Sequence, residues 1–550
     1  MKPNKVCFLF TAFFYLLCSH GIAQTTVGKI WNCQTIPSGL NNLKSLASLV
    51  LTNDTTPKVI NIFFHIIRRT DGTGGLTNDQ VSSWILTLCN DYRQHQIIIH
   101  ENGRADLNNT TYYNGITDGN YLSLVNTATH SDAIDVYLLS PSDTYSRSIG
   151  IPGIACAVGG SFLGTSVLSH ELGHCLGLYH THCGRGCNDF TNCSENTDGS
   201  NCLSCGDLIC DTPADPCLSG NVDANCNYIG NNSFHPDVHN IMSYAPPTCL
   251  THLTIGQTIR IHSTIISSSI FSTRSFKPYI SGPSLICSSG GATFTVNNVP
   301  PGCSVVWSSS SNITLPQNKN VNPIVASGSG YGNGSMQATL ISPCGNVNLP
   351  NMNVWVGPPN TTSISGPSTV KYLVGNSYYA YADYNNGTSF RWWTSPATNT
   401  RVYPYPQYNM ANIYFDYPGG YTVYAKASNV CGENSAPLGK FVMVTGPGSM
   451  SLYPNPASDI VNITIAESQP LSVTDSTTVM SASSLSVAST NDKPTTYNIT
   501  IANSKGVVCY TTTKYSKTFT IPVQSLPNGN YSFTIVDGVN KYSSQLAVLH

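Results

Sequence analysis

The stretch HELGHCLGLYH, residues 170–180, fits the pattern H-E-x-x-H-x-x-G-x-x-H. His170 and His174 are four residues apart, so one face of a predicted helix presents both imidazoles. Gly177 tolerates a positive φ, which lets the chain leave that helix sharply. The turn would then bring His180 back toward the other two histidines. The spacing therefore predicts a site where three imidazoles converge.

Three histidines are a typical ligand set for a catalytic Zn²⁺, because three protein ligands leave the fourth position open for water. Zinc lowers the pKa of such a water and polarises a scissile carbonyl. Glu171 follows the first histidine directly and is predicted to be the general base, which takes the proton and passes it to the leaving amine. The segment thus indicates zinc-dependent hydrolysis of a peptide bond.

A second segment further along the chain supports this interpretation. Asn240-Ile241-Met242-Ser243-Tyr244 has the form of a Met-turn, which would place Met242 beneath the three histidines. Tyr244 is predicted to donate a hydrogen bond to the oxyanion of the tetrahedral intermediate. The alternative role of Tyr244 is packing.

Three further stretches carry a resemblance to a known family. They are GDLICDTP at 206–213, Cys249 shortly after the Met-turn, and LTIGQTIR at 253–260. Together with the histidine motif they resemble the pappalysin family (M43, cytophagalysin subgroup) of metzincins, over about residues 57–270. The resemblance implies a zinc endopeptidase with a long active-site cleft and a protein or peptide substrate. The cysteine-rich insert at 183–205 departs from the family pattern.

The same resemblance implies a structural Ca²⁺ in the loop before the Met-turn. Asp207, Asp211 and the Thr212 carbonyl offer the hard oxygen ligands that calcium prefers. The alternative is that these are ordinary turn carboxylates.

The family pattern also implies disulfide bonds in this region. Cys217–Cys249 is expected to tie the loop to the Met-turn, and Cys226 is expected to pair upstream, with Cys193 as a candidate. Connectivity among the remaining cysteines cannot be deduced from sequence.

The N-terminus indicates export. Lys2 and Lys5 precede an apolar run at 6–18 and the small-residue site Gly21-Ile22-Ala23, which together predict a signal peptide over residues 1–23. A short propeptide is predicted over 24–56, and it contains Cys33. Because a thiolate is a good zinc ligand, Cys33 is a candidate cysteine switch that blocks the open zinc position of a zymogen. The alternative is a disulfide with Cys89 or another cysteine.

Composition excludes several function classes. The 550 residues carry 25 Lys+Arg and 27 Asp+Glu, a net charge of -2, and only 9% of residues are charged. Nucleic-acid binding is excluded, because it needs a basic surface. An apolar content of 40% argues against charge-driven disorder. After residue 23 no apolar run reaches the roughly 20 residues that a transmembrane helix needs.

Beyond about residue 276 the pattern changes to short strands and turns, with an internal repeat. ISGPS at 280–284 recurs at 364–368, Trp307 is matched with Trp393, and Cys344-Gly345 with Cys431-Gly432. We interpret the tryptophans and cysteines as core residues. The repeat predicts two β-sandwich modules, similar to immunoglobulin or PKD modules, over 276–360 and 361–447.

Residues 448–550 resemble the C-terminal sorting domain of the type IX secretion system. The resemblance rests on YPNPA at 453–457 and PNGNY at 527–531, and a Ser/Thr-rich insert at 467–494 is expected to be flexible. It implies the type IX machinery as a partner, and a location outside or on the surface of a Gram-negative bacterium. The alternative is a third adhesive β-module.

The predicted fold is therefore multi-domain. An α+β metzincin catalytic domain at 57–275, with a twisted sheet and a zinc-binding helix, precedes the sandwich modules and a β-sandwich sorting domain. The predicted function is that of a secreted zinc-dependent endopeptidase. The alternative is a non-catalytic surface adhesin that uses a metzincin-like scaffold.

Overall fold

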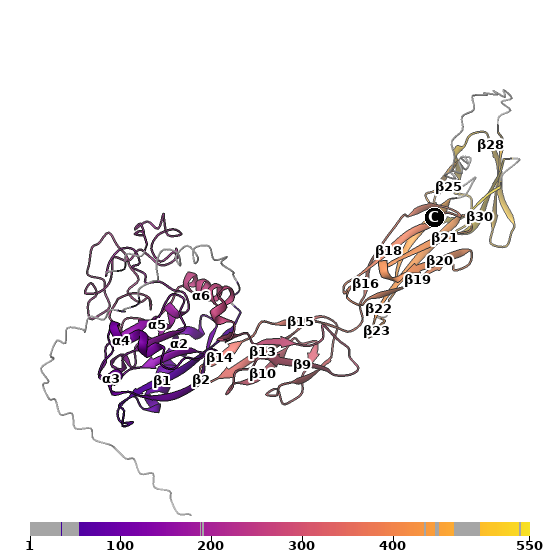
Figure 1. Ribbon diagram of the computed structural model, residues 1–550. Helices are drawn as coiled ribbons and strands as arrows, with labels where there is room; N and C mark the ends of the chain where they lie inside the picture. The colour runs from indigo at the N-terminus through magenta and orange to yellow at the C-terminus, as the bar shows by residue number, and fades with distance from the viewer. Residues whose placement is uncertain are drawn as a thin grey trace, which may run out of the picture.

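The structure is a computed structural model (Figure 1). It describes residues 33, 35, 54, 56–187, 189, 192–433, 436–445, 450–466, 495–537 and 541–550. The predicted signal peptide and the Ser/Thr-rich insert at 467–494 lie outside the described residues. Of the predicted propeptide, only Cys33, Thr35, Asp54 and Thr56 are described.

The first domain is built on a six-stranded sheet of order β2-β1-β3-β5-β4, with β6 paired to β1. Strands β1, β2, β3 and β5 run parallel, and β4 and β6 are antiparallel to their neighbours. The strands are rich in the β-branched and aromatic residues that suit a pleated surface. Their bounds are β1 Lys58–Arg68, β2 Ile97–Asn108, β3 Ile134–Leu138, β4 Ser146–Ser148, β5 Ala155–Val158 and β6 Ser275–Phe276.

Helices cover this sheet (Figure 1). Helix α2 (Asn78–Arg93) begins after the N-cap Thr77, which forms a capping box with Gln80. Its buried face packs in one core with the inward side chains of β1 and with α5. The other helices are α3 Thr110–Tyr113, α4 Asp118–Val125, η1 Gly160–Phe162, α5 Val167–Cys175, α6 Ile255–Ser267 and η2 Ser269–Phe271.

The next domain, called module 1, is a sandwich of two sheets with orders β10-β13-β15-β8 and β11-β12-β9-β7. Its strands alternate buried and exposed residues, as a half-buried strand does, and enclose Trp307 and Phe294. They are β7 Tyr279–Ser281, β8 Leu285–Ile286, β9 Ala292–Asn297, β10 Ser304–Ser309, β11 Ile313–Thr314, β12 Ile324–Gly328, β13 Gly332–Ser342, β14 Gly345–Asn348 and β15 Met352–Val356.

Module 2 repeats this architecture with the sheet orders β16-β18-β21-β20 and β17-β24-β22-β19. Its core includes Tyr378, Trp392 and Phe415. Its elements are β16 Thr361–Ser365, β17 Thr369–Lys371, β18 Asn376–Ala382, β19 Ser389–Ser395, β20 Thr400–Tyr405, η3 Pro406–Tyr408, β21 Met410–Phe415, β22 Gly419–Asn429, β23 Gly432–Glu433 and β24 Leu438–Thr445.

Both modules have the same strand arrangement, but the predicted match of Trp307 with Trp393 was wrong. Trp307 is buried and lies opposite Ala338, and the residue in the equivalent place is Trp392, which is buried and lies opposite Ala425. Trp393 points to the other face of the sheet, where it stacks on Tyr424. Successive side chains of a strand point to opposite faces, so an offset error of one residue exchanges core for surface.

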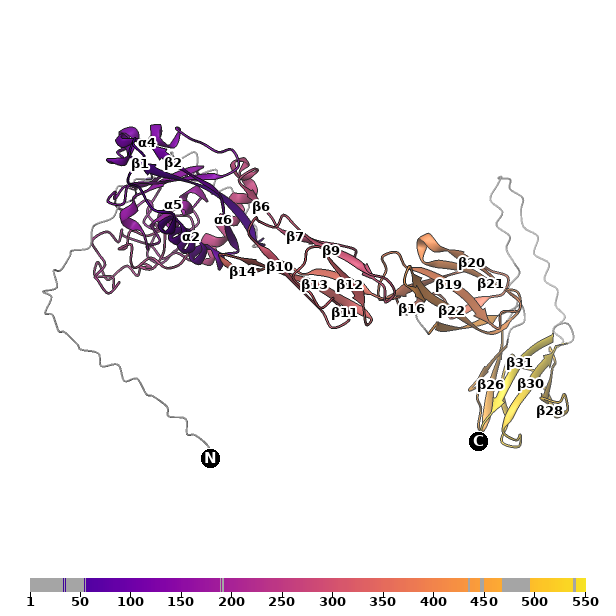
Figure 2. The same ribbon diagram turned by 90° about the horizontal axis from the view of Figure 1, so that it is seen from below.

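The C-terminal domain packs a three-stranded sheet, β25-β26-β29, and a four-stranded sheet, β28-β27-β30-β31, around one core. Its strands are β25 Met450–Tyr453, β26 Ile460–Ile465, β27 Tyr497–Asn503, β28 Val508–Lys514, β29 Thr518–Pro522, β30 Gly529–Val536 and β31 Lys541–Val548. Figure 2 shows the four domains following one another from the first domain to this one.

Disulfides join consecutive domains. Cys89 in α2 is bonded to Cys344 of module 1, and Cys287 of module 1 is bonded to Cys431 of module 2. The interpretation of Cys344 and Cys431 as core residues was therefore wrong, since both are cross-links between domains. Val59 of β1 packs within the core of module 1, so the first two domains also share apolar contacts.

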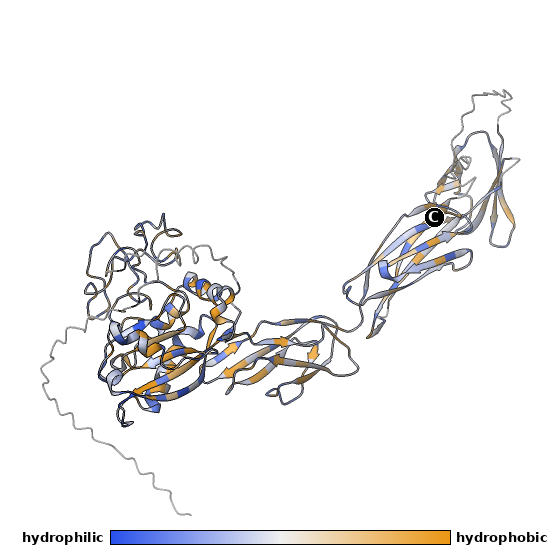
Figure 3. Ribbon diagram, in the orientation of Figure 1, coloured by the Kyte–Doolittle hydropathy of each residue, from blue (hydrophilic) through white to orange (hydrophobic). Residues whose placement is uncertain are grey.

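Hydrophobic residues line the strands of the first domain and alternate with polar ones in the modules (Figure 3). Within the described ranges, none of the helices combines the length and apolar character needed to cross a membrane.

Candidate metal centre

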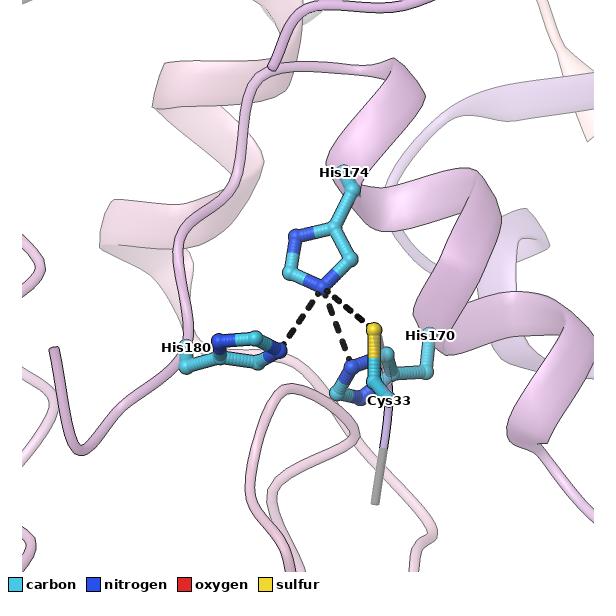
Figure 4. Close-up of side chains that lie close together, drawn as sticks. All are labelled: Cys33, His170, His174 and His180. Carbon is cyan, nitrogen blue, oxygen red and sulfur yellow. Dashed lines mark hydrogen bonds between the residues drawn. The ribbon is translucent and has the colours of Figure 1, made fainter. Parts of the chain in front are cut away.

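Three imidazoles converge on one point in the first domain (Figure 4). The Nε2 atom of His174 lies 3.1 Å from Nε2 of His170 and 3.0 Å from Nε2 of His180. All three side chains are buried. Burial lowers the pKa of His174 to about 4, so its imidazole is neutral and its ring nitrogen is free to bind a metal.

Each ring is fixed through its other nitrogen. The Nδ1–H of His170 donates to the carbonyl of Ile241 at 2.7 Å, and that of His174 to the carbonyl of Leu178 at 2.8 Å. His180 Nδ1 lies 2.9 Å from Oδ2 of Asp189. Such partners set the tautomer and orientation of metal-binding histidines, so all three rings present Nε2 to the common point.

The sequence pattern did not predict the contact of Asp189 with His180. Asp189 lies in the cysteine-rich segment after the histidine motif, and both it and His180 have side chains at most 6% exposed. No spacing rule marks it, because its contact depends on how the loop folds back. An acidic residue soon after the third histidine was the only available signal.

The local backbone explains the motif. Helix α5 ends at Cys175, and Gly177 has a φ of +95° in the turn that leads to His180. A Cβ atom at Gly177 would lie 2.5 Å from Oγ1 of Thr264 in α6. Glycine is therefore required both for its conformation and for the close approach of α6.

Met242 lies against helix α5. Its side chain is fully buried, and a Cβ on Gly173 of α5 would meet its Sδ at 2.5 Å. The Met242 amide donates to Oδ1 of Asn240 at 2.9 Å. The turn thus packs directly against the helix that carries His170 and His174.

Glu171 is fully buried beside the three histidines. Burial raises the pKa of its carboxyl to about 7, although hydrogen bonds oppose this shift. The Thr35 hydroxyl donates to Glu171 Oε2 at 3.0 Å, and the Cys33 thiol donates to the same oxygen at 3.4 Å. The carboxyl can therefore exchange a proton near neutral pH.

Cys33 lies within the histidine cluster. Its Sγ is 3.6 Å from His174 Nε2, and the four side chains of Cys33 and the three histidines form one potential metal-ligand group (Figure 4). Burial, and secondly the charge of Glu171, raise the pKa of the thiol. The alternative of a Cys33–Cys89 disulfide is wrong, because Cys89 is bonded to Cys344 and Cys33 is a free thiol.

Tyr244 packs against the histidine cluster. Its ring centre is 4.7 Å from that of His180, and its hydroxyl donates to the Cys33 carbonyl at 2.6 Å. Burial raises the pKa of the Tyr244 hydroxyl, which keeps it a hydrogen-bond donor. The hydroxyl is thus directed at a carbonyl oxygen next to the histidines.

The predicted calcium ligands have different partners. Asp207 accepts from the Thr212 hydroxyl at 2.9 Å and from a backbone amide, whereas Asp211 accepts from the Thr254 hydroxyl and the Gly256 amide at the start of α6. Burial raises the pKa of Asp207. Protein donors thus engage both carboxylates, and calcium stays a prediction.

The disulfide pairs expected from the family pattern were wrong, although all four cysteines are in disulfides. Cys217 pairs with Cys187 rather than Cys249, and Cys226 pairs with Cys249 rather than Cys193. Cys193 pairs with Cys205. Three of these bonds join residues 12 to 30 positions apart, so many partners were equally near along the chain.

The sequence of this region is similar to those of known metalloproteases. Residues 161–266 match the peptidase M43 family, described as pregnancy-associated plasma protein-A. An extracellular metalloprotease of Verticillium alfalfae is 28% identical over 228 residues, which cover 37% of this chain and 74% of that protein. An extracellular metalloprotease of Neurospora crassa is 26% identical over 276 residues, covering 44% and 90%.

Among solved structures, the FN1–FN3 domains of chicken CNTN1 align over 50% of this chain and 98% of their own, at 9% identity and a TM-score of 0.18. The sequence matches support an extracellular M43 metalloprotease. Because the relatives are fungal, they do not support a Gram-negative source.

Proposed function

We propose that the chain is a secreted zinc endopeptidase that is synthesised as a latent precursor. The observation that carries this proposal is the convergence of His170, His174 and His180 on one point, with the buried Glu171 beside them. A non-catalytic adhesin would have no need of a general base at that position.

The residues present fit zinc. Three neutral imidazoles offer nitrogen ligands from one side, and each is oriented by a carbonyl or carboxylate on its other nitrogen. When bound there, zinc supplies Lewis-acid polarisation of the scissile carbonyl and lowers the pKa of the attacking water.

The protein residues supply the proton transfers and the orientation. Glu171 takes a proton from the attacking water at its Oε2 and delivers it to the leaving amine. Tyr244 keeps its proton and donates a hydrogen bond to the oxyanion of the tetrahedral intermediate. The Cys33 carbonyl, which it now contacts at 2.6 Å, marks a place for the substrate oxygen.

Latency follows from the contacts of the 33–35 segment. Cys33 Sγ lies beside His174, where it would take the open zinc position, and its carbonyl engages Tyr244. Thr35 engages Glu171 and accepts from the Ser148 amide at 2.7 Å. Cys33 and Thr35 together would therefore cover the metal position, the general base and the oxyanion donor.

The activity is tested with Glu171→Ala in protein matured by removal of residues up to about 56. We expect this variant to bind zinc as the wild type does but to lose hydrolysis of casein and gelatin. Asp237→Ala is the control, because it removes a carboxylate that pairs with His252. This variant should keep activity. If matured, zinc-loaded wild-type protein cleaves neither substrate, the proposal is wrong.

Latency is tested in the uncleaved chain. Cys33→Ser removes the soft sulfur ligand but keeps a similar shape, so we expect basal hydrolysis to rise toward that of matured protein. Cys509→Ser changes an exposed free cysteine and should leave the precursor latent. Equal activity of wild-type precursor and matured protein would rule the switch out.

We further propose that residues 448–550 are the sorting domain read by a type IX secretion machinery, as their sequence resemblance suggests. A chain that ends at residue 447 should then fold and, once matured, hydrolyse casein, but it should remain inside a type IX-competent host. Export of that shortened chain would contradict the proposal.

A further inference from the structure

The outer face of one module 2 sheet, β16-β18-β21-β20, is rich in exposed tyrosine. Four of these side chains are 40–50% exposed, namely Tyr379 and Tyr381 of β18 and Tyr403 and Tyr405 of β20. Tyr414 of β21 is partly exposed on the same face. These five residues are called the tyrosine face below. Exposed aromatic groups gathered on one surface usually mark an interaction site.

Strand register arranges the tyrosines in rows. Tyr379, Met410 and Tyr405 are direct neighbours across three strands, and Ser377, Asn412 and Tyr403 form the next row. Strands lie about 4.8 Å apart and every second residue about 6.7 Å along a strand. The backbone therefore spaces Tyr379 and Tyr405 roughly 10 Å apart, with small polar or flexible side chains between them.

Two of the rings, Tyr403 and Tyr414, are held in place by a ring contact. Tyr403 and Tyr414 pack edge to face with centroids 5.8 Å apart, and the Arg401 guanidinium lies 4.8 Å above the Tyr414 ring. Arg401 is neutralised by Asp416 at 2.8 Å. Rings fixed on strands lose little conformational entropy when a ligand binds.

Module 1 serves as an internal reference for this face. Phe294 of β9 and Tyr378 of β18 occupy equivalent buried places, because Phe294 lies opposite Ile324 and Tyr378 lies opposite Ala411. With this alignment, the module 1 counterparts of Tyr379, Tyr381 and Tyr414 are Thr295, Asn297 and Ser327.

Module 1 shows that the tyrosines of the tyrosine face are not needed for the sandwich to fold. The same sandwich forms in module 1 without these aromatic side chains, so the fold does not require them. Strand β11 of module 1 also ends at Thr314, whereas β20 of module 2 runs on to Tyr405. Two of the five tyrosines thus lie on a strand extension that module 1 lacks.

We propose that the tyrosine face is a binding platform for a neutral polysaccharide. Flat aromatic rings pack against the C–H faces of pyranose rings, while the tyrosine hydroxyls offer hydrogen bonds to sugar hydroxyls. A row of rings along the face of a sheet suits an extended, repeating chain.

The charge of the face favours this ligand over other macromolecules. A nucleic acid or an acidic glycan needs unpaired cations, and the arginine on this face is already paired with Asp416. Protein partners use complementary charges to fix register, and the remaining side chains of the face named above are uncharged. An uncharged polysaccharide, which is rich in hydroxyl groups, matches both the tyrosine rings and their hydroxyls.

The test replaces tyrosines by the residues that module 1 carries. The variant Tyr379→Thr/Tyr381→Asn/Tyr414→Ser is made in the full chain, and its unfolding midpoint is compared with that of the wild type. Binding to insoluble cellulose, chitin, xylan and starch granules is measured by depletion from solution. Tyr279→Thr, which removes an exposed tyrosine of module 1, is the matched control.

We expect wild-type and Tyr279→Thr protein to bind at least one of these polysaccharides, and the triple variant to bind it at least roughly tenfold more weakly with an unchanged midpoint. A wild-type chain that binds none of them overturns the proposal, as does a triple variant that binds equally well. A dimer that the triple variant disrupts, or retention on gelatin that depends on the same tyrosines, assigns the face to a protein partner instead and also overturns it.

Discussion

Replacing Asp189 tests whether the three histidines form a metal site and whether their outer partners matter. Asp189→Ala removes the acceptor that lies 2.9 Å from Nδ1 of His180. His180 should then lose its fixed tautomer and orientation, while all three ligands remain in place. We expect zinc affinity to fall, and the hydrolytic rate of fully zinc-loaded, matured protein to fall much less.

The size of the expected loss of zinc affinity follows from the contact between Asp189 and His180. Side chains that orient metal-binding histidines are worth about 10- to 100-fold in metal affinity, which is about 1.4–2.8 kcal/mol. A hydrogen bond to a charged group contributes about 1.5–3 kcal/mol, and this one is shielded, since the two side chains are 1% and 6% exposed. The two ranges overlap, so a loss near 30-fold is expected.

The assay is a zinc titration against a competing chelator, on matured protein carrying Glu171→Ala to prevent self-digestion. Asp237→Ala is the matched control, because Asp237 pairs with His252 at 2.8 Å and not with one of the three histidines. Equal zinc affinity with and without Asp189 would refute the reasoning. An equal loss in the Asp237 variant would do so as well, since it would show a general effect of removing a carboxylate.

Three further outcomes are expected. Gly177→Ala should destabilise the first domain by about 2–5 kcal/mol in thermal or urea unfolding, because a positive φ and a Cβ 2.5 Å from Thr264 Oγ1 add strain and overpacking. Tyr244→Phe should lower kcat by about 10²-fold with zinc content unchanged, as loss of an oxyanion donor does; an unchanged kcat would leave Tyr244 a packing role. Burial raises the pKa of Glu195 to about 7, so wild-type stability should fall relative to Glu195→Gln as pH rises from about 4.5 to 7, and parallel unfolding curves against pH would contradict this.

Local periodicity predicted the helix and the turn that position the three histidines of the candidate metal centre. The i, i+4 spacing of His170 and His174 and the glycine at 177 depend on helix geometry over one segment, and the structure has the helix and the turn there. The capping box at the start of α2 and the β-branched residues of β1 are local features of the same kind.

Contacts between distant segments could not be predicted in this way. Asp189 reaches His180 only through the fold of an irregular loop, and the partner of Cys89 lies 255 residues away. The error at Trp393 has a different origin, since the choice between two adjacent tryptophans depends on strand register, which one residue reverses.

The Cys89–Cys344 bond has a practical consequence for anyone who purifies this protein. A single cut in the backbone anywhere between those two positions leaves both pieces attached to each other. Gel electrophoresis without reductant would then show one band of full mass, while a reduced sample would show two. A cut between Cys89 and Cys344, including one that the protein makes in itself, would thus pass unnoticed unless the sample is reduced.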